Sequence, residues 1–161
     1  MKVLFLDIDG VLNDHTYNEV AGSNTIKPEC VRHFNHIIAK VPDLRIVLSS
    51  AWRYMILNGA MTKSGFRHML QTHGVSKEIN VFDVLRQDST QVEGDKGIRD
   101  RSEKIATWVR DYEAMTGRID QWAALDDLAL ELDPEHFVRT DGKVGLTEQD
   151  ALRVIEILNR R

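Results

Sequence analysis

Short apolar runs alternate with longer amphipathic segments along this chain. Residues 3–6 and 44–48 are compact apolar runs that end in polar residues, and both predict buried strands. Further short runs at 79–85, 122–125 and 136–139 predict three more strands, of which 79–85 has the weakest pattern. The hydrophobic pattern therefore predicts five short strands distributed along the whole chain.

Four amphipathic segments lie between and after these runs and predict helices. The first begins near Pro28, which suits the first turn of a helix, and the second covers residues 65–73. The third follows Asp100 or Ser102 as a possible N-cap, and the fourth follows Thr147. Strands that alternate with helices predict an α/β fold with a mostly parallel sheet and helices on both faces.

The length and composition restrict what such a fold can be. With 161 residues, the chain is expected to form one domain spanning 1–161. The longest apolar stretches are about five residues, far below the ~20 that span a bilayer, so neither a membrane segment nor a signal peptide is expected. The single Cys30 excludes an internal disulfide and a cysteine-based zinc site. These features favour a cytoplasmic location.

The charge balance bears on the partners of the protein. Lys and Arg total 21 against 25 Asp and Glu, which gives a net charge of −4. This balance is not typical of a protein that binds nucleic acid through its overall charge, although a local basic cleft remains compatible with it.

Candidate chemistry lies where the predicted strands end, because parallel sheets bind ligands beyond the carboxyl ends of their strands. Three strands run into polar residues there: Asp7 and Asp9, Ser49 and Ser50, and Asp126 and Asp127. Like charges as close as Asp7 and Asp9 raise one another's pKa unless a cation lies between them. The pair therefore indicates a divalent metal or a proton-sharing acid and base, unless Asp9 and Gly10 simply form a turn.

The segment 7–12, Asp-Ile-Asp-Gly-Val-Leu, resembles the first motif of phosphatases of the haloacid dehalogenase (HAD) superfamily. In that superfamily a strand ending in Ser or Thr, a basic residue at the start of a later helix, and a strand ending in an acidic pair follow in order. The matching positions here are Ser49-Ser50, Arg101 or Lys104, and Asp126-Asp127.

The chain is still more similar to the HAD domains of Swiss Army knife RNA repair proteins. Members of that group share five short motifs, which match residues 9–13, 49–53, 101–109, 125–127 and 145–147. Two departures are Lys104, where Glu is usual, and Val109, where Leu is usual. The resemblance implies a three-layer, Rossmann-like, parallel sheet. The spans before and after the second strand leave room for a minimal cap domain at most, which favours an open site and a bulky phosphate ester.

The resemblance also implies roles for the residues at the strand ends. Asp7 would be the nucleophile and Asp9 the general acid and base. Mg²⁺ would be held by Asp7, by the backbone carbonyl of Asp9, and by Asp126 or Asp127. The phosphoryl oxygens would be held by Ser50, with Ser49 as the less favoured alternative, and by Arg101 or Lys104. Arg53 would contact a second phosphate or a ribose.

The expected function is that of a Mg²⁺-dependent phosphomonoesterase that acts through an aspartyl-phosphate on an RNA or DNA end, with RNA repair proteins as partners. One alternative is a nucleotide or small-metabolite phosphatase whose site is closed by a loop over residues 87–100 or by a dimer partner. Another is a catalytically idle binding module. Trp52 is expected to pack in the core or at its rim, with base stacking as the less favoured alternative.

Overall fold

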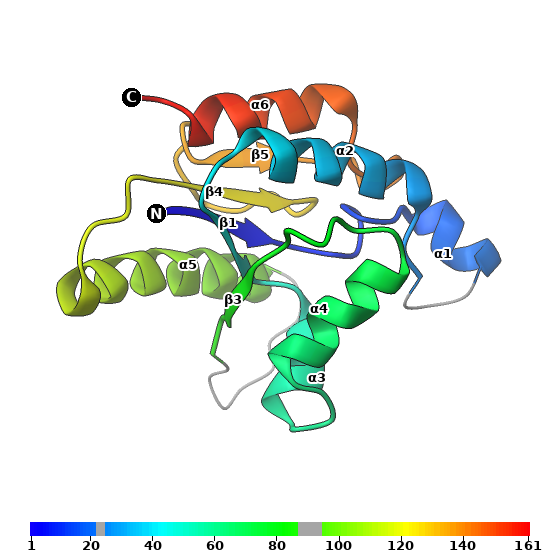
Figure 1. The fold of residues 1–161 in the computed structure, drawn as a ribbon, viewed down its shortest axis with the longest axis horizontal. Helices are drawn as coiled ribbons and strands as arrows, with labels where there is room; N and C mark the ends of the chain where they lie inside the picture. Colours follow the sequence, from blue (N-terminus) through cyan, green and yellow to red (C-terminus); the bar gives the residue numbers. More distant parts are fainter. Residues whose placement is uncertain (22–24, 87–94) are drawn as a thin grey trace.

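The computed structural model describes residues 1–21, 25–86 and 95–161. It contains a five-stranded sheet in the order β3-β2-β1-β4-β5, and every neighbouring pair of strands is parallel (Figure 1). The strands are β1 (Lys2–Leu6), β2 (Leu44–Leu48), β3 (Val81–Val84), β4 (Gln121–Asp126) and β5 (Phe137–Arg139). All five predicted strands are therefore present, with ends that shift by at most two residues.

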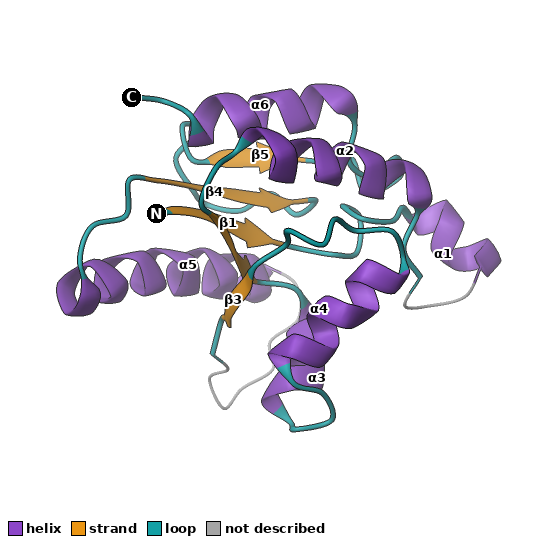
Figure 2. Cartoon of the chain, viewed as in Figure 1, coloured by secondary structure: helices purple, strands orange, loops and turns teal. Residues whose placement is uncertain are grey.

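Helices cover both faces of this sheet (Figure 2). The helices are α1 (His15–Ala21), α2 (Pro28–Lys40), α3 (Tyr54–Leu57), α4 (Lys63–Thr72), α5 (Asp95–Thr116) and α6 (Glu148–Leu158), and a short 3₁₀ turn spans Ala51–Arg53. Helices α2 and α6 lie side by side on one face and α5 lies on the other. The predicted α/β class, with a parallel sheet between two helical layers, is confirmed.

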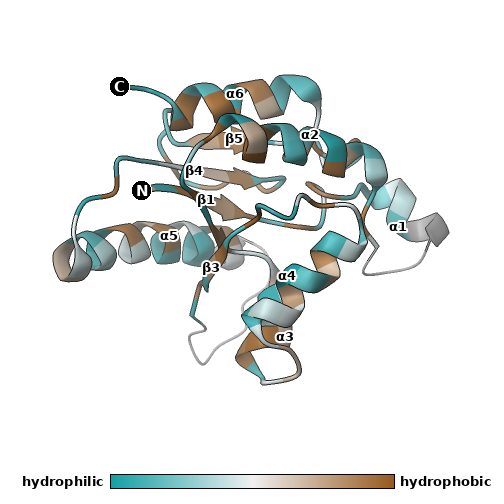
Figure 3. Cartoon of the chain, in the orientation of Figure 1, coloured by the Kyte–Doolittle hydropathy of each residue, from teal (hydrophilic) through white to brown (hydrophobic). Residues whose placement is uncertain are grey.

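The central strand β1 shows why the chain forms this arrangement. Successive side chains of a strand point to opposite faces, so an uninterrupted apolar run can fill two cores at once. Leu4 and Leu6 belong to the core under α2 and α6, whereas Val3 and Phe5 pack in the core with Ile105 of α5. The buried residues of α2 and α6 belong to the first of these cores, and Figure 3 shows hydrophobic and hydrophilic stretches alternating along both helices.

The predicted helix ends were correct in one case and wrong in another. Thr147 caps α6 through a capping box with Asp150, as its spacing predicts. Helix α5, however, begins at Asp95 instead of near residues 100–102. Ser102 lies inside the helix, where its hydroxyl donates to the carbonyl of Ile98, one turn earlier, instead of capping the first turn. Of the loop expected over residues 87–100, residues 95–100 are helical and 87–94 lie outside the described residues.

Two further observations concern the layout of the chain. Within the part of the chain that the structure describes, no second sheet covers the carboxyl ends of the strands. None of the helices described is both long enough and apolar enough to cross a membrane.

Candidate active site

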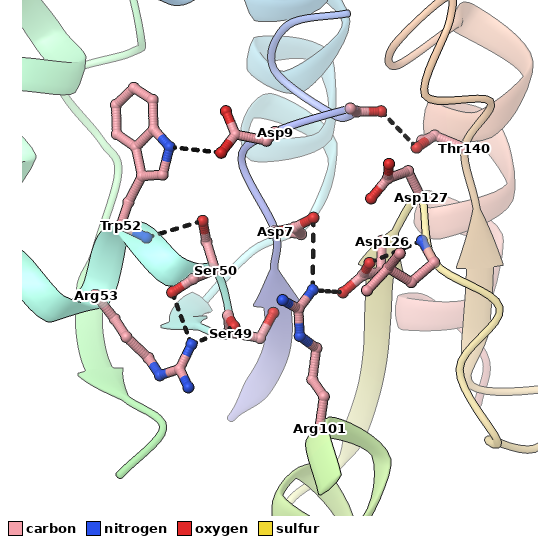
Figure 4. A network of polar contacts seen from close by, with 12 residues as sticks. Asp7, Asp9, Ser49, Ser50, Trp52, Arg53, Arg101, Asp126, Asp127 and Thr140 are labelled. Atoms are coloured by element: carbon pink, nitrogen blue, oxygen red, sulfur yellow. Dashed lines mark hydrogen bonds and ion pairs between the residues drawn. The ribbon is translucent and has the colours of Figure 1, made fainter. Parts of the chain in front are cut away.

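The parallel register brings three strand ends to one edge of the sheet. Leu6 at the end of β1 is level with Leu48 of β2 and Leu125 of β4, so the residues that follow these strands are neighbours. The amide of Asp7 donates to the Leu125 carbonyl at 3.0 Å, and the amide of Ser49 donates to the Leu6 carbonyl at 3.1 Å. The sequence-predicted residues of the first, second and fourth strand ends therefore meet (Figure 4).

Three carboxylates and one guanidinium form what we term the charged cluster: Asp7, Asp126, Asp127 and Arg101. One oxygen from each carboxylate lies within 4.8 Å of the others. Nη1 of Arg101, on α5, lies 2.6 Å from Oδ2 of Asp126 and 3.6 Å from Oδ2 of Asp7. Asp7 and Asp126 are buried, with 4% and 1% of their surface exposed. The cluster thus concentrates negative charge in a place from which water is largely excluded.

Burial and mutual repulsion shift the titration of this cluster. Burial raises the pKa of Asp7 well above its ordinary value, the charge of Asp126 raises it further, and Arg101 only partly opposes them. Burial likewise raises the pKa of Asp126 against the opposing effect of Arg101. Burial lowers the pKa of Arg101, but the charges of Asp7 and Asp126 outweigh it and the pKa rises. One guanidinium therefore does not fully compensate the acids around it.

The residues present fit a divalent cation. Carboxylate oxygens are the hard ligands that Mg²⁺ prefers, and the three oxygens lie close enough to share one ion. An ion there would also relieve the repulsion that raises the pKa of Asp7. The side chain of Asp9 is not part of this carboxylate group.

Asp9 instead points toward the loop after β2 (Figure 4). Its Oδ2 accepts a hydrogen bond from Nε1 of Trp52 at 3.0 Å, and its Oδ1 accepts one from Nδ2 of Asn13 at 2.9 Å. Asn13 is itself fixed, because its Oδ1 accepts from the amide of Gly10 at 2.8 Å. Asp7 and Asp9, two residues apart in sequence, therefore have different surroundings.

Gly10 is required for the close approach of the first and fourth strand ends. Its φ is +80°, a region that disfavours residues with a side chain. A Cβ atom at this position would lie 2.4 Å from Oδ2 of Asp127, far closer than van der Waals contact allows. The turn after Asp9 is thus real, but it serves to bring Asp127 beside the first motif. The carbonyl of Gly10 also accepts a hydrogen bond from Oγ1 of Thr140 at 2.7 Å.

Ser49 and Ser50 are both buried beside Asp7 at the end of β2. The Ser50 hydroxyl accepts from the amide of Trp52 at 3.2 Å and so caps the 3₁₀ turn. The capping role that Ser residues commonly have is therefore present. A hydroxyl that accepts a hydrogen bond keeps its own proton for donation, so capping and phosphate binding are compatible.

Arg53 lies next to the site, but its guanidinium is buried and binds backbone groups. Its guanidinium donates to the carbonyls of Ser49 and Ser50, both at 2.9 Å, and to the carbonyl of Leu85 at 3.1 Å. Its remaining nitrogen donates to the hydroxyl of Tyr54, and the residue is buried. In this structure Arg53 holds the loop after β2 to β3 instead of presenting its charge to a second phosphate or a ribose.

The structure distinguishes the two candidates for the basic residue. Arg101 lies between Asp7 and Asp126, whereas Nζ of Lys104 pairs with Asp100 at 2.7 Å. Lys104 also lines a groove of about 520 Å³ between α5 and β3, outside the charged cluster. Of the two candidates, Arg101 is the one that pairs with the acids, and Figure 4 shows it projecting from α5 toward the ends of β1 and β4.

Sequence reasoning did not anticipate the contacts of several residues that the structure places at the site. Asn13 was noted only as part of a motif. The expected packing of Trp52 in the core is confirmed, but its hydrogen bond to Asp9 was not expected. Trp52 is 5% exposed, which leaves no open face for a base. Thr140 follows β5, so the strand-end rule applied to that strand would have found it. Nε2 of His15 also lies 3.4 Å from Oδ2 of Asp127.

Comparisons with known proteins agree with this geometry. A search of curated proteins and a search of solved structures each found no match to the chain. The family model for the HAD domain in Swiss Army Knife RNA repair proteins, in contrast, matches residues 3–151. The match covers all of the charged cluster and, apart from Lys2 of β1, all five described strands. The chain therefore belongs to the family of HAD domains found in Swiss Army Knife RNA repair proteins.

Proposed function

We propose that this protein is a Mg²⁺-dependent phosphomonoesterase that works through an aspartyl-phosphate intermediate. The observation that carries the proposal is the position of Asp7, which ends the central strand beside two further carboxylates and the guanidinium of Arg101. A buried carboxylate among these groups has the surroundings of a nucleophile for phosphoryl transfer. The family of the chain supports the same class of reaction.

The proposed reaction has two steps. In the first, an oxygen of Asp7 forms a bond to phosphorus while the bond to the ester oxygen breaks, and that oxygen takes a proton from Asp9. In the second, water attacks the aspartyl-phosphate and gives a proton to Asp9, which releases inorganic phosphate and restores both carboxyl groups. Asp9 is thus an acid in the first step and a base in the second.

The surrounding residues hold the reacting groups. Arg101 and the Ser50 hydroxyl would bind phosphoryl oxygens, since fixed donors and cations stabilise charge that is redistributed in the transition state. Asp7, Asp126 and Asp127 would hold Mg²⁺ together with the backbone carbonyl of Asp9. The ion, when bound, supplies positive charge against the phosphate and the crowded acids.

The proposed substrate is a phosphorylated RNA or DNA end. The family description names RNA repair proteins, which makes proteins of RNA repair the proposed partners. The end of an RNA or DNA chain is bulky, and it suits an active site that no second sheet covers among the described residues. A phosphatase for nucleotides or small metabolites would share the same chemistry, so the substrate panel below separates the two.

The test is phosphate release by wild type and Asp7→Asn, with and without Mg²⁺. Substrates should include 3′- and 5′-phosphorylated oligonucleotides, nucleotides and sugar phosphates. We expect Asp7→Asn to lose at least about a thousandfold in kcat, since no other group replaces the nucleophile. Asp111→Asn, a change at an exposed Asp on α5, is the matched control and should keep wild-type rates.

The outcomes separate the parts of the proposal. Equal, metal-independent rates for wild type and Asp7→Asn would exclude the mechanism. Activity on nucleotides and sugar phosphates that equals the activity on oligonucleotides would exclude only the preference for polynucleotide ends. Preference for oligonucleotides should weaken as salt is added, because contacts to further phosphates are screened.

A further inference from the structure

The loop after β2 holds the side chain of Asp9 from a distance of 43 residues along the chain. Nε1 of Trp52 donates to Oδ2 of Asp9 at 3.0 Å, while Asn13 donates to Oδ1 at 2.9 Å. Each oxygen therefore accepts one hydrogen bond from a neutral donor. Because both oxygens are held, the plane of the carboxyl group is fixed as well as its position.

Trp52 is itself fixed from three directions. Its amide donates to the hydroxyl of Ser50, and its ring packs edge-on against Phe66 with centroids 6.5 Å apart. The guanidinium of Arg53 ties the same turn to the carbonyls of Ser49 and Ser50. With 5% of its surface exposed, the indole has little freedom to leave Asp9.

We infer that Trp52 is a positioning residue for proton transfer by Asp9, an inference that rests on the proposed function. An indole N–H can donate but cannot accept or carry the transferred proton, so Trp52 acts only through Asp9. General acids must lie within hydrogen-bond reach of the leaving oxygen, and small displacements are costly. The loop after β2 thus has two parts in the proposed reaction. Ser50 would bind the phosphoryl group, and Trp52 orients the carboxyl group of Asp9.

The sharpest test compares two esters in Trp52→Phe, which keeps an aromatic ring against Phe66 and removes the N–H donor. An alkyl phosphate such as glycerol 2-phosphate needs a proton on its leaving oxygen, whereas p-nitrophenyl phosphate releases a phenolate that needs none. We expect kcat/KM for the alkyl ester to fall by about ten- to a hundredfold, part of the contribution of general acid catalysis, because kcat/KM reports on formation of the aspartyl-phosphate and not on its later hydrolysis. The value of kcat/KM for the aryl ester should fall by less than about threefold.

The chain offers a matched control in Trp108→Phe. Nε1 of Trp108 donates to Oδ2 of Asp83 at 2.8 Å, so this variant removes the same kind of hydrogen bond to an Asp. Trp108 lies on α5 and packs against Phe5 and Tyr112, away from the charged cluster. Both esters should be hydrolysed at wild-type rates by Trp108→Phe, because its N–H does not act on Asp9.

A measurement that needs no activity follows the indole protons by NMR. The Trp52 indole proton should exchange slowly with solvent in the wild type, and replacement of its acceptor in Asp9→Ala should speed that exchange about tenfold or more. The Trp108 indole proton should not change in the same variant. Fast exchange of the Trp52 indole proton in the wild type would overturn the inference.

The kinetic outcomes keep the inference apart from the proposed function. An active wild type with equal losses in kcat/KM on both esters in Trp52→Phe would show general damage to the fold and overturn the positioning role alone. An active wild type with no loss on the alkyl ester would do the same. A wild type that hydrolyses neither ester would overturn the proposed function and the inference with it.

Discussion

The two sides of the site hold their carboxylates in opposite ways. On one side, the charged cluster places Asp7 and Asp126 in the interior, with Arg101 as the cation between them. On the other side, Asp9 is only half-buried and its oxygens accept from neutral donors, Trp52 and Asn13. The negative charge on the first side is partly compensated by a positive charge, whereas on the second side the carboxyl group is oriented by neutral donors.

This difference corresponds to the two proposed roles. A nucleophile must stay ionised while it is surrounded by other anions, so Asp7 needs cations near it. A general acid must exchange a proton in each step, which neutral donors permit without holding a permanent ion pair in place. The two Asp residues of one short motif can therefore do different work because the side chains around them come from different strands and helices.

The largest expected effect is on the charged side, in Arg101→Met. The change leaves two buried carboxylates without their cation, which should lower the free energy of unfolding by about 3–5 kcal/mol in metal-free buffer at neutral pH. It should also lower kcat/KM for phosphate esters by about a hundredfold or more. Urea unfolding and steady-state kinetics measure the two effects.

Lys104→Met is the matched control for that change. Lys104 pairs with Asp100, whose side chain is 41% exposed, so removal of the Lys104 charge should cost below about 1 kcal/mol and leave kcat/KM within about threefold. Loss of activity in Lys104→Met with normal activity in Arg101→Met would reverse the assignment of the basic residue.

A smaller effect concerns the pH dependence of stability without metal. The pKa of Asp7 is raised in the folded protein, so its contribution to stability is complete below its unfolded value and is lost as pH rises through the folded value. Asn at this position cannot ionise, so the variant does not lose this stability as pH rises. The stability of Asp7→Asn relative to wild type should therefore increase between about pH 4 and neutrality.

Urea unfolding of both proteins across this range, in the presence of a chelator, measures that difference. Added Mg²⁺ should reduce it, since the ion stabilises the ionised form of Asp7 in wild type. Parallel stability curves for the two proteins would show that the fold does not penalise the charge of Asp7, and the contrast between the two sides would fail.

The smallest expected effect is on the neutral side, in Ser50→Ala. The Ser50 hydroxyl caps the turn that carries Trp52, and loss of such a cap costs about 1 kcal/mol. Thermal unfolding of Ser50→Ala and Ser49→Ala, which does not remove the cap, measures the difference. If both variants unfold at the same temperature, the cap does not stabilise the turn that presents Trp52 to Asp9.

Much of the fold could be predicted from the sequence because its signals are local. The apolar run of β1 and the polar residues after it indicate a buried strand that ends at a site, and Thr147 with Asp150 marks the start of α6. The start of α5 was missed because Ser102, a residue that often begins helices, bonds inside one here. The roles of Asn13, Trp52 and Thr140 were also missed, since each depends on a partner from another motif or strand.

The sequence alone determined the order of the five strands and of helices α2, α4, α5 and α6, the family resemblance, and which strand ends carry acids and hydroxyls, whereas the short helices α1 and α3 were not predicted. These follow from periodicity and from residues adjacent in the chain. Only the tertiary structure decided that Arg101 and not Lys104 reaches the acids, that Arg53 binds backbone carbonyls, and that Trp52 donates to Asp9. Such choices depend on sheet register and on the direction of each side chain from its helix or turn, which neighbours distant in sequence determine.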